Sequence, residues 1–117
     1  MAEGLDHKAV ARRLRILRHR AVGGGHGAQM RFVARIDVEY AQWNNLERSY
    51  PLARDMALKL VHAFPGVTLD WLYLGRMDGM SSVLQGELLE AEKAVTLEEG
   101  DSPSRSSSKA SKRKRRA

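Results

Sequence analysis

The chain is 117 residues long, carries a formal net charge of +6 and contains no cysteine. Its length suits one domain with tails, and the absence of cysteine excludes a disulfide framework and a thiolate metal site and fits a reducing cytoplasm. No apolar run approaches the roughly 18 residues of a membrane span, and the start lacks the apolar stretch of a signal peptide.

The first predicted helix covers residues 6–20, with Asp6 placed to cap its N-terminus. Four apolar residues recur at helical spacing along it and just beyond it: Val10, Leu14, Leu17 and Ala21. Its outer face carries Arg12, Arg13 and Arg15. We expect this face either to be solvated or, through Arg12 and Arg15, to contact a phosphate backbone.

A connector with four glycines within residues 23–27 ends this helix. It lacks the preceding strand and the following Lys with Ser or Thr that a phosphate-binding loop requires. After it, the stretch QMRFVARIDVEYAQWNNL, residues 29–46, predicts two short helices. The helical spacing of the apolar residues breaks at Asp37 and Val38, which predicts a tight turn there.

The second helix of this pair, over residues 39–48, has two different faces. Trp43 and Leu46 lie three residues apart on the face expected to dock on a core. The opposite face carries Ala41, Asn44, Asn45 and Arg48. These groups suit a major groove, because Asn can bond an adenine edge twice, Arg can bond a guanine edge, and a small side chain can meet a thymine methyl group. A polar outer face is equally typical of any surface helix, so the pattern leaves both interpretations open.

Two more helices are predicted to complete the core. Pro51 is expected at or near the first position of a helix that extends to about residue 64. Its apolar residues are Leu52, Met56, Leu60, Val61 and Phe64. Thr68 is then predicted to cap a short helix that Gly75 closes. The residues expected to face inward are Leu69, Leu72 and either Trp71 or Tyr73.

The composition changes at Ser81. Ser82 is predicted to cap an amphipathic helix over about residues 82–95, within an acidic segment that covers residues 82–99. The apolar stripe of this helix is formed by Val83, Leu84, Leu88, Ala91 and Val95. The helix could pack back on the domain, pair with its twin in a dimer, or fray, and the sequence does not choose among these.

The last segment, residues 100–117, is rich in Ser, Lys and Arg and is predicted to be disordered. Residues 81–100 hold one Lys against five Glu, whereas residues 101–117 hold seven Lys and Arg against one Asp. A chain with this basic balance favours polyanions, most often nucleic acid. Five consecutive cations lie near its end: Lys112, Arg113, Lys114, Arg115 and Arg116. They either contact nucleic acid or anionic surfaces non-specifically, act as a nuclear localisation signal in a eukaryote, or only keep the chain in solution.

Several motifs keep the order and spacing of one known domain. They are LRILR at 14–18, Gln29 opening the second helix, Phe32, Ile36 and Val38 around the turn, NLER at 45–48, Pro51, and LDWL at 69–72. In these features the chain resembles the phage Cro and repressor type of helix-turn-helix domain, the xenobiotic-response-element family of bacterial regulators. The resemblance covers about residues 8–76. It implies an all-α, five-helix domain over residues 6–76, with a possible extra helix after it.

The resemblance also implies a bacterial cytoplasmic protein, associated with the nucleoid, that binds double-stranded DNA as a homodimer on a near-palindromic operator and most often represses transcription. Base contacts would come from Tyr40, Ala41, Gln42, Asn44 and Asn45, and phosphate contacts from Gln29, Arg12, Arg15, Arg31 and Arg48. In some members an arginine late in the first helix pairs with a glutamate that ends the recognition helix. Arg18 and Glu47 occupy those places here.

The chain departs from the family pattern at several positions. Val33 stands where the family favours alanine, Asp37 where it favours glycine, Glu39 where it favours a small hydroxyl residue, and Trp43 where it favours a smaller aliphatic residue. Glu39 also brings negative charge close to where a phosphate would lie. These departures support a second hypothesis, a protein-interaction module such as an antitoxin or an anti-activator, which the acidic segment 82–99 also favours.

Catalysis is not indicated by the residue pattern. The four histidines are scattered without metal-ligand spacing: His7, His19, His26 and His62. No Ser, His and Asp set and no facing pair of carboxylates is implied. We therefore expect no enzymatic activity, no metal, no cofactor and no small-molecule ligand. The leading hypothesis is a sequence-specific DNA-binding regulator.

Overall fold

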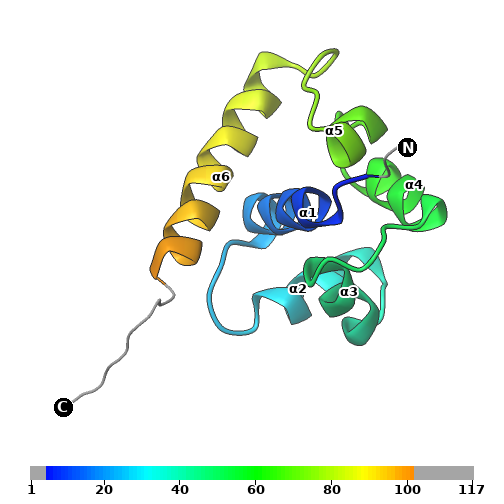
Figure 1. The fold of residues 1–117 in the computed structure, drawn as a ribbon, viewed down its shortest axis with the longest axis vertical. Helices are drawn as coiled ribbons and strands as arrows, with labels where there is room; N and C mark the ends of the chain where they lie inside the picture. The colour runs from blue at the N-terminus through cyan, green and yellow to red at the C-terminus, as the bar shows by residue number, and fades with distance from the viewer. Residues whose placement is uncertain (1–4, 102–117) are drawn as a thin grey trace.

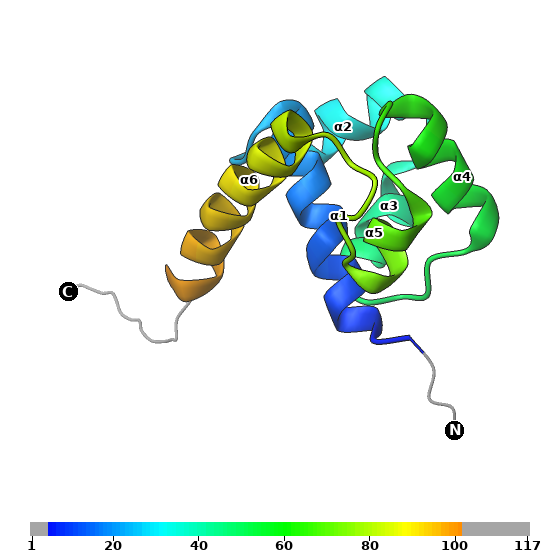
Figure 2. The same ribbon diagram turned by 90° about the horizontal axis from the view of Figure 1, so that it is seen from above.

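Helix α1 (His7–Val22) lies at the centre of the fold, with α6 along one side and the other helices on the other side (Figures 1 and 2). The computed structural model of the chain describes residues 5–101. Its other helices are α2 (Ala28–Ile36), α3 (Tyr40–Glu47), α4 (Arg54–Ala63), α5 (Leu69–Leu74) and α6 (Ser82–Asp101). All regular secondary structure in residues 5–101 is helical, which confirms the predicted all-α class. Helix α6 extends beyond the predicted end at about residue 95 and includes residues 100 and 101, so the prediction of a disordered tail from residue 100 is wrong at these two positions. From residue 102 on, the predicted tail lies outside the described residues, and with it the cations at 112–116.

Helix α1 begins at the predicted cap and buries the predicted apolar stripe. The Asp6 Oδ1 atom accepts hydrogen bonds from the backbone N–H groups of Lys8, at 3.1 Å, and Ala9, at 3.2 Å. These two bonds satisfy donors that have no partner inside the helix. The buried residues of the stripe are Val10, Leu14 and Leu17. Because α1 contacts α2, α3, α5 and α6, its apolar residues form the middle of the core.

A three-residue turn, Asp37 to Glu39, joins α2 to α3. Asp37 has φ 59° and ψ 56°, the left-handed conformation that glycine adopts without strain and that aspartate tolerates better than most residues. The turn brings the ring of Phe32 in α2 to 4.6 Å from the ring of Trp43 in α3, centroid to centroid. Phe32 also stacks on Phe64, just after α4, at 5.6 Å. This buried aromatic cluster holds α2, α3 and α4 together.

Helix α4 begins later than the sequence predicts. Its first residue is Arg54 and its N-cap residue is Ala53, so the expectation that Pro51 lies at or near the first helical position is wrong. Residues 50–53 have no regular secondary structure. Leu52 is buried there, and its carbonyl oxygen accepts a hydrogen bond of 2.8 Å from the Tyr73 hydroxyl group. The burial of Leu52 and this bond hold the segment outside the helix.

Helix α5 is closed at both ends by the predicted residues. The Thr68 hydroxyl oxygen accepts a hydrogen bond of 3.0 Å from the backbone N–H of Trp71. Gly75 has φ 79°, a left-handed conformation common after the last helical residue. The predicted inward position of Leu69 is wrong, because Trp71 and Leu72 fill the side of this short helix that faces the core and Leu69 is exposed.

Helix α6 packs back along α1, the first of the three arrangements that the sequence allows (Figure 1). Its buried stripe consists of Leu84, Leu88, Ala91 and Val95. Val83 was expected in this stripe but is exposed, because it lies about 100° around the helix from Leu84. Ser81, not Ser82, caps the helix, since the Ser81 hydroxyl oxygen accepts a hydrogen bond of 3.1 Å from the backbone N–H of Leu84.

The substitution Leu88→Ala measures how much α6 contributes to stability. Leu88 is 1% exposed, so we expect a loss of about 2–5 kcal/mol in the free energy of unfolding, because truncation removes apolar contacts and leaves a cavity. Urea unfolding followed by far-UV circular dichroism measures the loss. The matched control is Leu89→Ala, since Leu89 is 47% exposed and should change stability by only about 0.5 kcal/mol. Equal losses for the two variants would contradict the packing of α6 on α1.

Candidate nucleic-acid interface

Helix α3 docks on the core by one face and exposes the other. Trp43, Leu46 and Glu47 are buried. Of the predicted base-contact residues, three are exposed, namely Tyr40, Ala41 and Gln42, and two are half-buried, namely Asn44 and Asn45. The helix has eight residues, and its N-cap residue Glu39 makes no side-chain cap hydrogen bond. Burial of Trp43, not local capping, therefore holds α3 in place.

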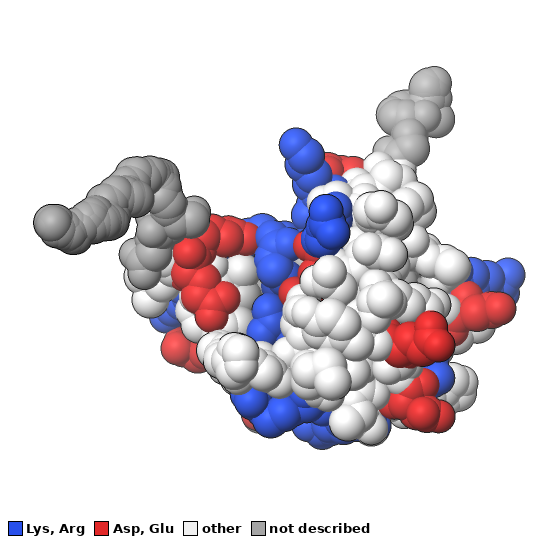
Figure 3. Space-filling model, turned by 90° about the horizontal axis from the view of Figure 1, so that it is seen from below, with Lys and Arg blue, Asp and Glu red and all other residues white. Residues whose placement is uncertain are grey.

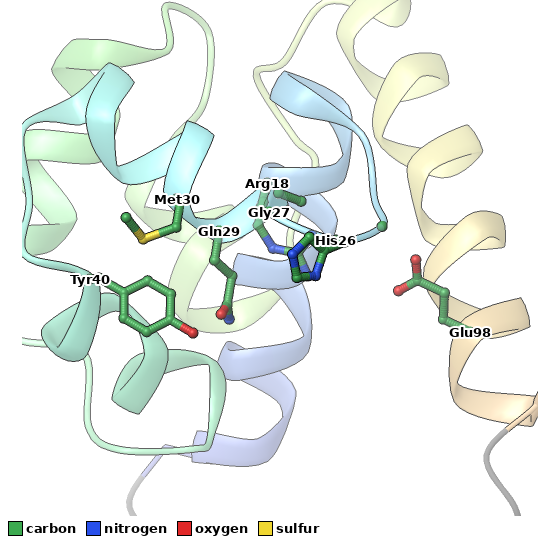
Figure 4. A pocket seen from close by; sticks show the side chains of 9 residues that line it. Arg18, His26, Gly27, Gln29, Met30, Tyr40 and Glu98 are labelled. Atoms are coloured by element: carbon green, nitrogen blue, oxygen red, sulfur yellow. The ribbon is translucent and has the colours of Figure 1, made fainter.

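A cavity of about 360 Å³ lies between the N-termini of α2 and α3. Gln29 and Tyr40 both line it, and Figure 4 shows their side chains beside the same space. Gly27 is the N-cap of α2 and offers no side chain to cap the helix. Because Gly27 and Ala28 also line the cavity, the partial positive charge of the helix N-terminus lies next to it. An anionic group such as a phosphate suits the electrostatics of this place.

A buried ion pair ties α3 to α1. The Arg18 Nε atom donates to Glu47 Oε2 at 2.7 Å, and Arg18 Nη2 donates to Glu47 Oε1 at 3.2 Å. The Nε1–H group of Trp43 donates to the same carboxylate. The side chains of Arg18 and Glu47 are only 9% and 5% exposed. This is the pair that the family resemblance suggested, and it fixes α3 relative to α1.

Arg12 and Arg15, two of the predicted phosphate-contact residues, are paired within the chain. Arg12 Nη1 lies 2.8 Å from Glu92 Oε2, and Arg12 Nε lies 3.2 Å from Glu99 Oε1. Arg15 Nη2 lies 2.8 Å from Glu99 Oε2, and Arg15 Nη1 donates to the Glu47 carbonyl oxygen at 2.9 Å. Of the two alternatives for this arginine face, the solvated one is wrong, because the glutamates of α6 partly cover it, and contact with a phosphate backbone stays a prediction.

These contacts shift the pKa of partners on both helices. Burial by itself lowers the pKa of Arg12, but hydrogen bonds to Glu92 and Glu99 and their negative charges outweigh it and raise the pKa above its ordinary value. Burial by itself raises the pKa of Glu99, but hydrogen bonds from Arg15 and Arg12 and their positive charges outweigh it and lower the pKa below 4.5. Both groups are thus favoured in their charged forms.

The other two predicted phosphate-contact arginines, Arg31 and Arg48, are exposed. Arg31 donates to the carbonyl oxygens of Val22, Gly24 and His26, at 3.2, 3.4 and 3.3 Å. It therefore stabilises the connector between α1 and α2 while its guanidinium stays accessible to an anion. Arg48 is the C-cap residue of α3, so it lies at the opposite end of that helix from the cavity.

Charge is unevenly distributed over the face that contains α2, α3 and the end of α6. Figure 3 shows basic side chains between α6 and the rest of the molecule, acidic side chains along α6 and at the far edge, and mainly uncharged surface between them. At the other flank of α3, three acidic residues line a shallow groove with Gln42 and Lys59. The acids are Asp37, Glu39 and Asp55. The centre of this face is therefore largely without charged side chains.

Glu98 and His26 line the cavity beside α2, although the residue pattern indicated no role in a site for either. The pairing of Glu92 and Glu99 with α1 was also missed. A signal for it exists, because Glu92 and Glu99 lie seven residues apart and so share one side of a helix, next to the apolar stripe of α6. Arg12 and Arg15 lie three residues apart, so they also share one side of α1.

Comparison with models of known protein families, with curated proteins and with solved structures finds no match to this chain. Within residues 5–101, none of the helices combines the length and apolarity that crossing a bilayer requires. In the same part of the chain, no group of three or more His, Asp or Glu side chains is placed to hold a metal ion.

The buried ion pair leads to a prediction about stability. Arg18→Met leaves the Glu47 carboxylate buried without its cation, so we expect a loss of about 3 kcal/mol in the free energy of unfolding. Adding Glu47→Gln should recover part of this loss, because the amide is neutral and its oxygen still accepts the Trp43 N–H. Urea unfolding compares both with Arg48→Met, an exposed control that should stay within about 0.5 kcal/mol of wild type. If Arg18→Met were as stable as this control, the buried pair would not fix α3.

The contacts of Glu99 lead to a prediction about pH. The Glu99 pKa lies below 4.5 in the folded chain, so its contribution to stability is present above about pH 4.5 and is lost as the pH falls through the folded pKa. In acid, the free energy of unfolding should therefore fall more steeply for wild type than for Glu99→Gln. The control is Glu90→Gln, because Glu90 is exposed and pairs with Lys93 on α6 itself. Identical pH dependence of wild type and Glu99→Gln would contradict the role of Glu99.

Proposed function

We propose that this chain is a sequence-specific DNA-binding transcriptional regulator, most simply a repressor, in which α1–α5 form a helix-turn-helix domain of the Cro and repressor type. The arrangement of α2, the turn at Asp37, and α3 carries the proposal. Trp43 anchors α3 in the core, while Tyr40, Ala41 and Gln42 on its first turn are exposed. In such an arrangement α3 enters the major groove and α2 lies across the DNA backbone.

The residues around this face support distinct roles in the proposed complex. Gln29 and the N-terminus of α2 border the cavity that suits a backbone phosphate. The side-chain amides of Gln42 and Asn45 can each bond an adenine edge in two places, and Ala41 can meet a thymine methyl group. A two-fold dimer would place two α3 helices in successive major grooves of a near-palindromic operator.

One observation on α6 favours a second candidate function. In this proposal the chain is a protein-interaction module such as an antitoxin or an anti-activator. Leu89 and Leu97 are 47% and 70% exposed, and both line a groove of about 770 Å³. Exposed leucines beside a groove suit the apolar side of a protein partner. Under this proposal α3 keeps its place in the fold without contacting bases.

Selection from a random pool of duplex DNA tests the first proposal. The full-length protein is incubated with the pool at roughly physiological salt, and the bound DNA is sequenced. We expect enrichment of an inverted repeat whose half-sites lie about one helical turn apart. Binding without any enrichment would contradict sequence specificity and direct attention to a protein partner.

Substitution of Asn45 tests the role of α3 on the selected operator. Asn45→Ala should weaken operator binding about 10-fold, because a bidentate base contact contributes about 1–3 kcal/mol, and should leave binding to random DNA unchanged. Truncation after residue 101 removes seven Lys and Arg and should weaken binding to both DNAs. Fluorescence anisotropy measures the affinities. Equal losses on operator and random DNA for Asn45→Ala would count against base contact by this residue.

Retention on heparin separates the two candidate functions. The chain truncated after residue 101 lacks the basic tail, so its retention reports the helical domain alone. Strong retention supports DNA binding by the domain. Weak retention supports the protein-interaction module.

A further inference from the structure

Helix α6 is held on α1 by two kinds of contact. The apolar stripe is buried along the length of the interface. Beside it, arginine–glutamate ion pairs join the two helices, among them Arg12–Glu92, Arg12–Glu99, Arg15–Glu99 and Arg20–Glu87. The Nε2 atom of His19 also lies 2.7 Å from Glu98 Oε2. The basic side of α1 is thus occupied by carboxylates of the same chain.

The carboxylate of Glu99 makes the contacts that a phosphate group makes with arginines. Its Oε1 atom lies 3.2 Å from Arg12 Nε, and its Oε2 atom lies 2.8 Å from Arg15 Nη2. One anionic group therefore bridges two guanidinium groups. Guanidinium groups bind carboxylates and phosphates with the same planar set of donors, so either anion can fill this position.

The end of α6 reaches the face that contains α3. Glu98 lines the same cavity as Gln29 and Tyr40, and Figure 4 shows it extending from α6 toward that cavity. Arg15, which Glu99 holds, also donates to the backbone carbonyl of the last residue of α3. The acids at the end of α6 therefore lie at the edge where a DNA backbone would approach α2 and α3.

We propose that the end of α6 competes with DNA for this edge. Its carboxylates occupy a backbone-binding surface formed by Arg12, Arg15 and the N-terminus of α2, and DNA phosphates bind there after displacing them. This inference rests on the proposed DNA-binding function. It adds a second contact with the DNA backbone, and it assigns to the carboxylates of α6 the effect of lowering the affinity for DNA.

The exposure of the contacts permits such an exchange. The side chains of Glu92, Glu98 and Glu99 are 39–49% exposed, and ion pairs at this exposure are weak and screened by salt. Phosphates gain an additional advantage, because DNA releases condensed counterions when arginines bind it. The buried stripe, with Leu88 at its centre, keeps the helix in place. Displacement therefore concerns the carboxylates and the last turns of α6, not the whole helix.

Neutralising two of these carboxylates in the full-length chain tests the proposal. Glu92→Gln combined with Glu99→Gln keeps the shape of both side chains and removes the charges that face Arg12 and Arg15. We expect tighter binding to a random-sequence DNA duplex at low salt. We also expect the slope of log K against log salt to steepen by about 1.8, because two phosphates, at about 0.9 each, then bind Arg12 and Arg15 without first breaking ion pairs that salt itself weakens. Fluorescence anisotropy over a salt series measures both quantities.

The matched control is Glu90→Gln combined with Asp78→Asn. It changes the net charge by the same amount at two exposed carboxylates, one of which pairs with Lys93 within α6 and one of which precedes α6. We expect a small rise in affinity and an unchanged salt slope. Adding Arg12→Gln and Arg15→Gln to the test variant should abolish its gain. Far-UV circular dichroism checks that every variant keeps the helical content of wild type.

The outcomes separate this inference from the proposed function. Equal salt slopes for the test and control variants, with operator binding intact, overturn the competition and leave the proposed function standing. A gain that persists without Arg12 and Arg15 overturns it as well, because net charge alone would then explain the gain. Failure of wild type and all variants to bind any DNA at low salt overturns the proposed function and this inference together.

Discussion

A guanidinium group and a carboxylate buried in a protein core must pair, because either charge left alone there would cost several kcal/mol. Arg18 on α1 and Glu47 on α3 form this pair, and the indole N–H of Trp43 donates to the same carboxylate. Helix α3 is too short to define its own position and has no side-chain cap. Its orientation, and hence the exposure of its first turn, depends on these three side chains.

The arginines of α1 connect it to several neighbours at once. Arg18 contacts α3, and Arg12 and Arg15 contact α6. Arg13 donates to the carbonyl oxygens of residues 72 and 73 in α5, both at 3.0 Å, and burial lowers its pKa although the charge of Asp6 acts in the opposite direction. The planar, many-donor guanidinium group suits this use, because one side chain can bond two partners with defined geometry.

The sequence pattern predicted five helices, a possible sixth and most of the core, because apolar spacing and caps such as Asp6 and Thr68 act locally. It failed where contacts between residues distant in sequence determine the local structure. The start of α4 depends on Leu52 being held by Tyr73, 21 residues later. The partners of Arg12 lie 80 residues or more away, so residue spacing on α1 alone could not show whether its arginines face solvent, DNA or another helix. The residues proposed to contact bases lie on α3, the helix that the sequence pattern assigned to them. The cavity beside Gln29 became apparent only from the structure.

The enclosed position of α1 has a consequence for hydrogen exchange. Because α1 is packed against α2, α3, α5 and α6, no single neighbouring helix can open and leave it fully solvated. Its backbone amides should therefore exchange only when the whole fold opens, whereas amides in the last turns of α6 exchange through local opening. The helix with the most arginines among the six is then also the one whose amides report global stability.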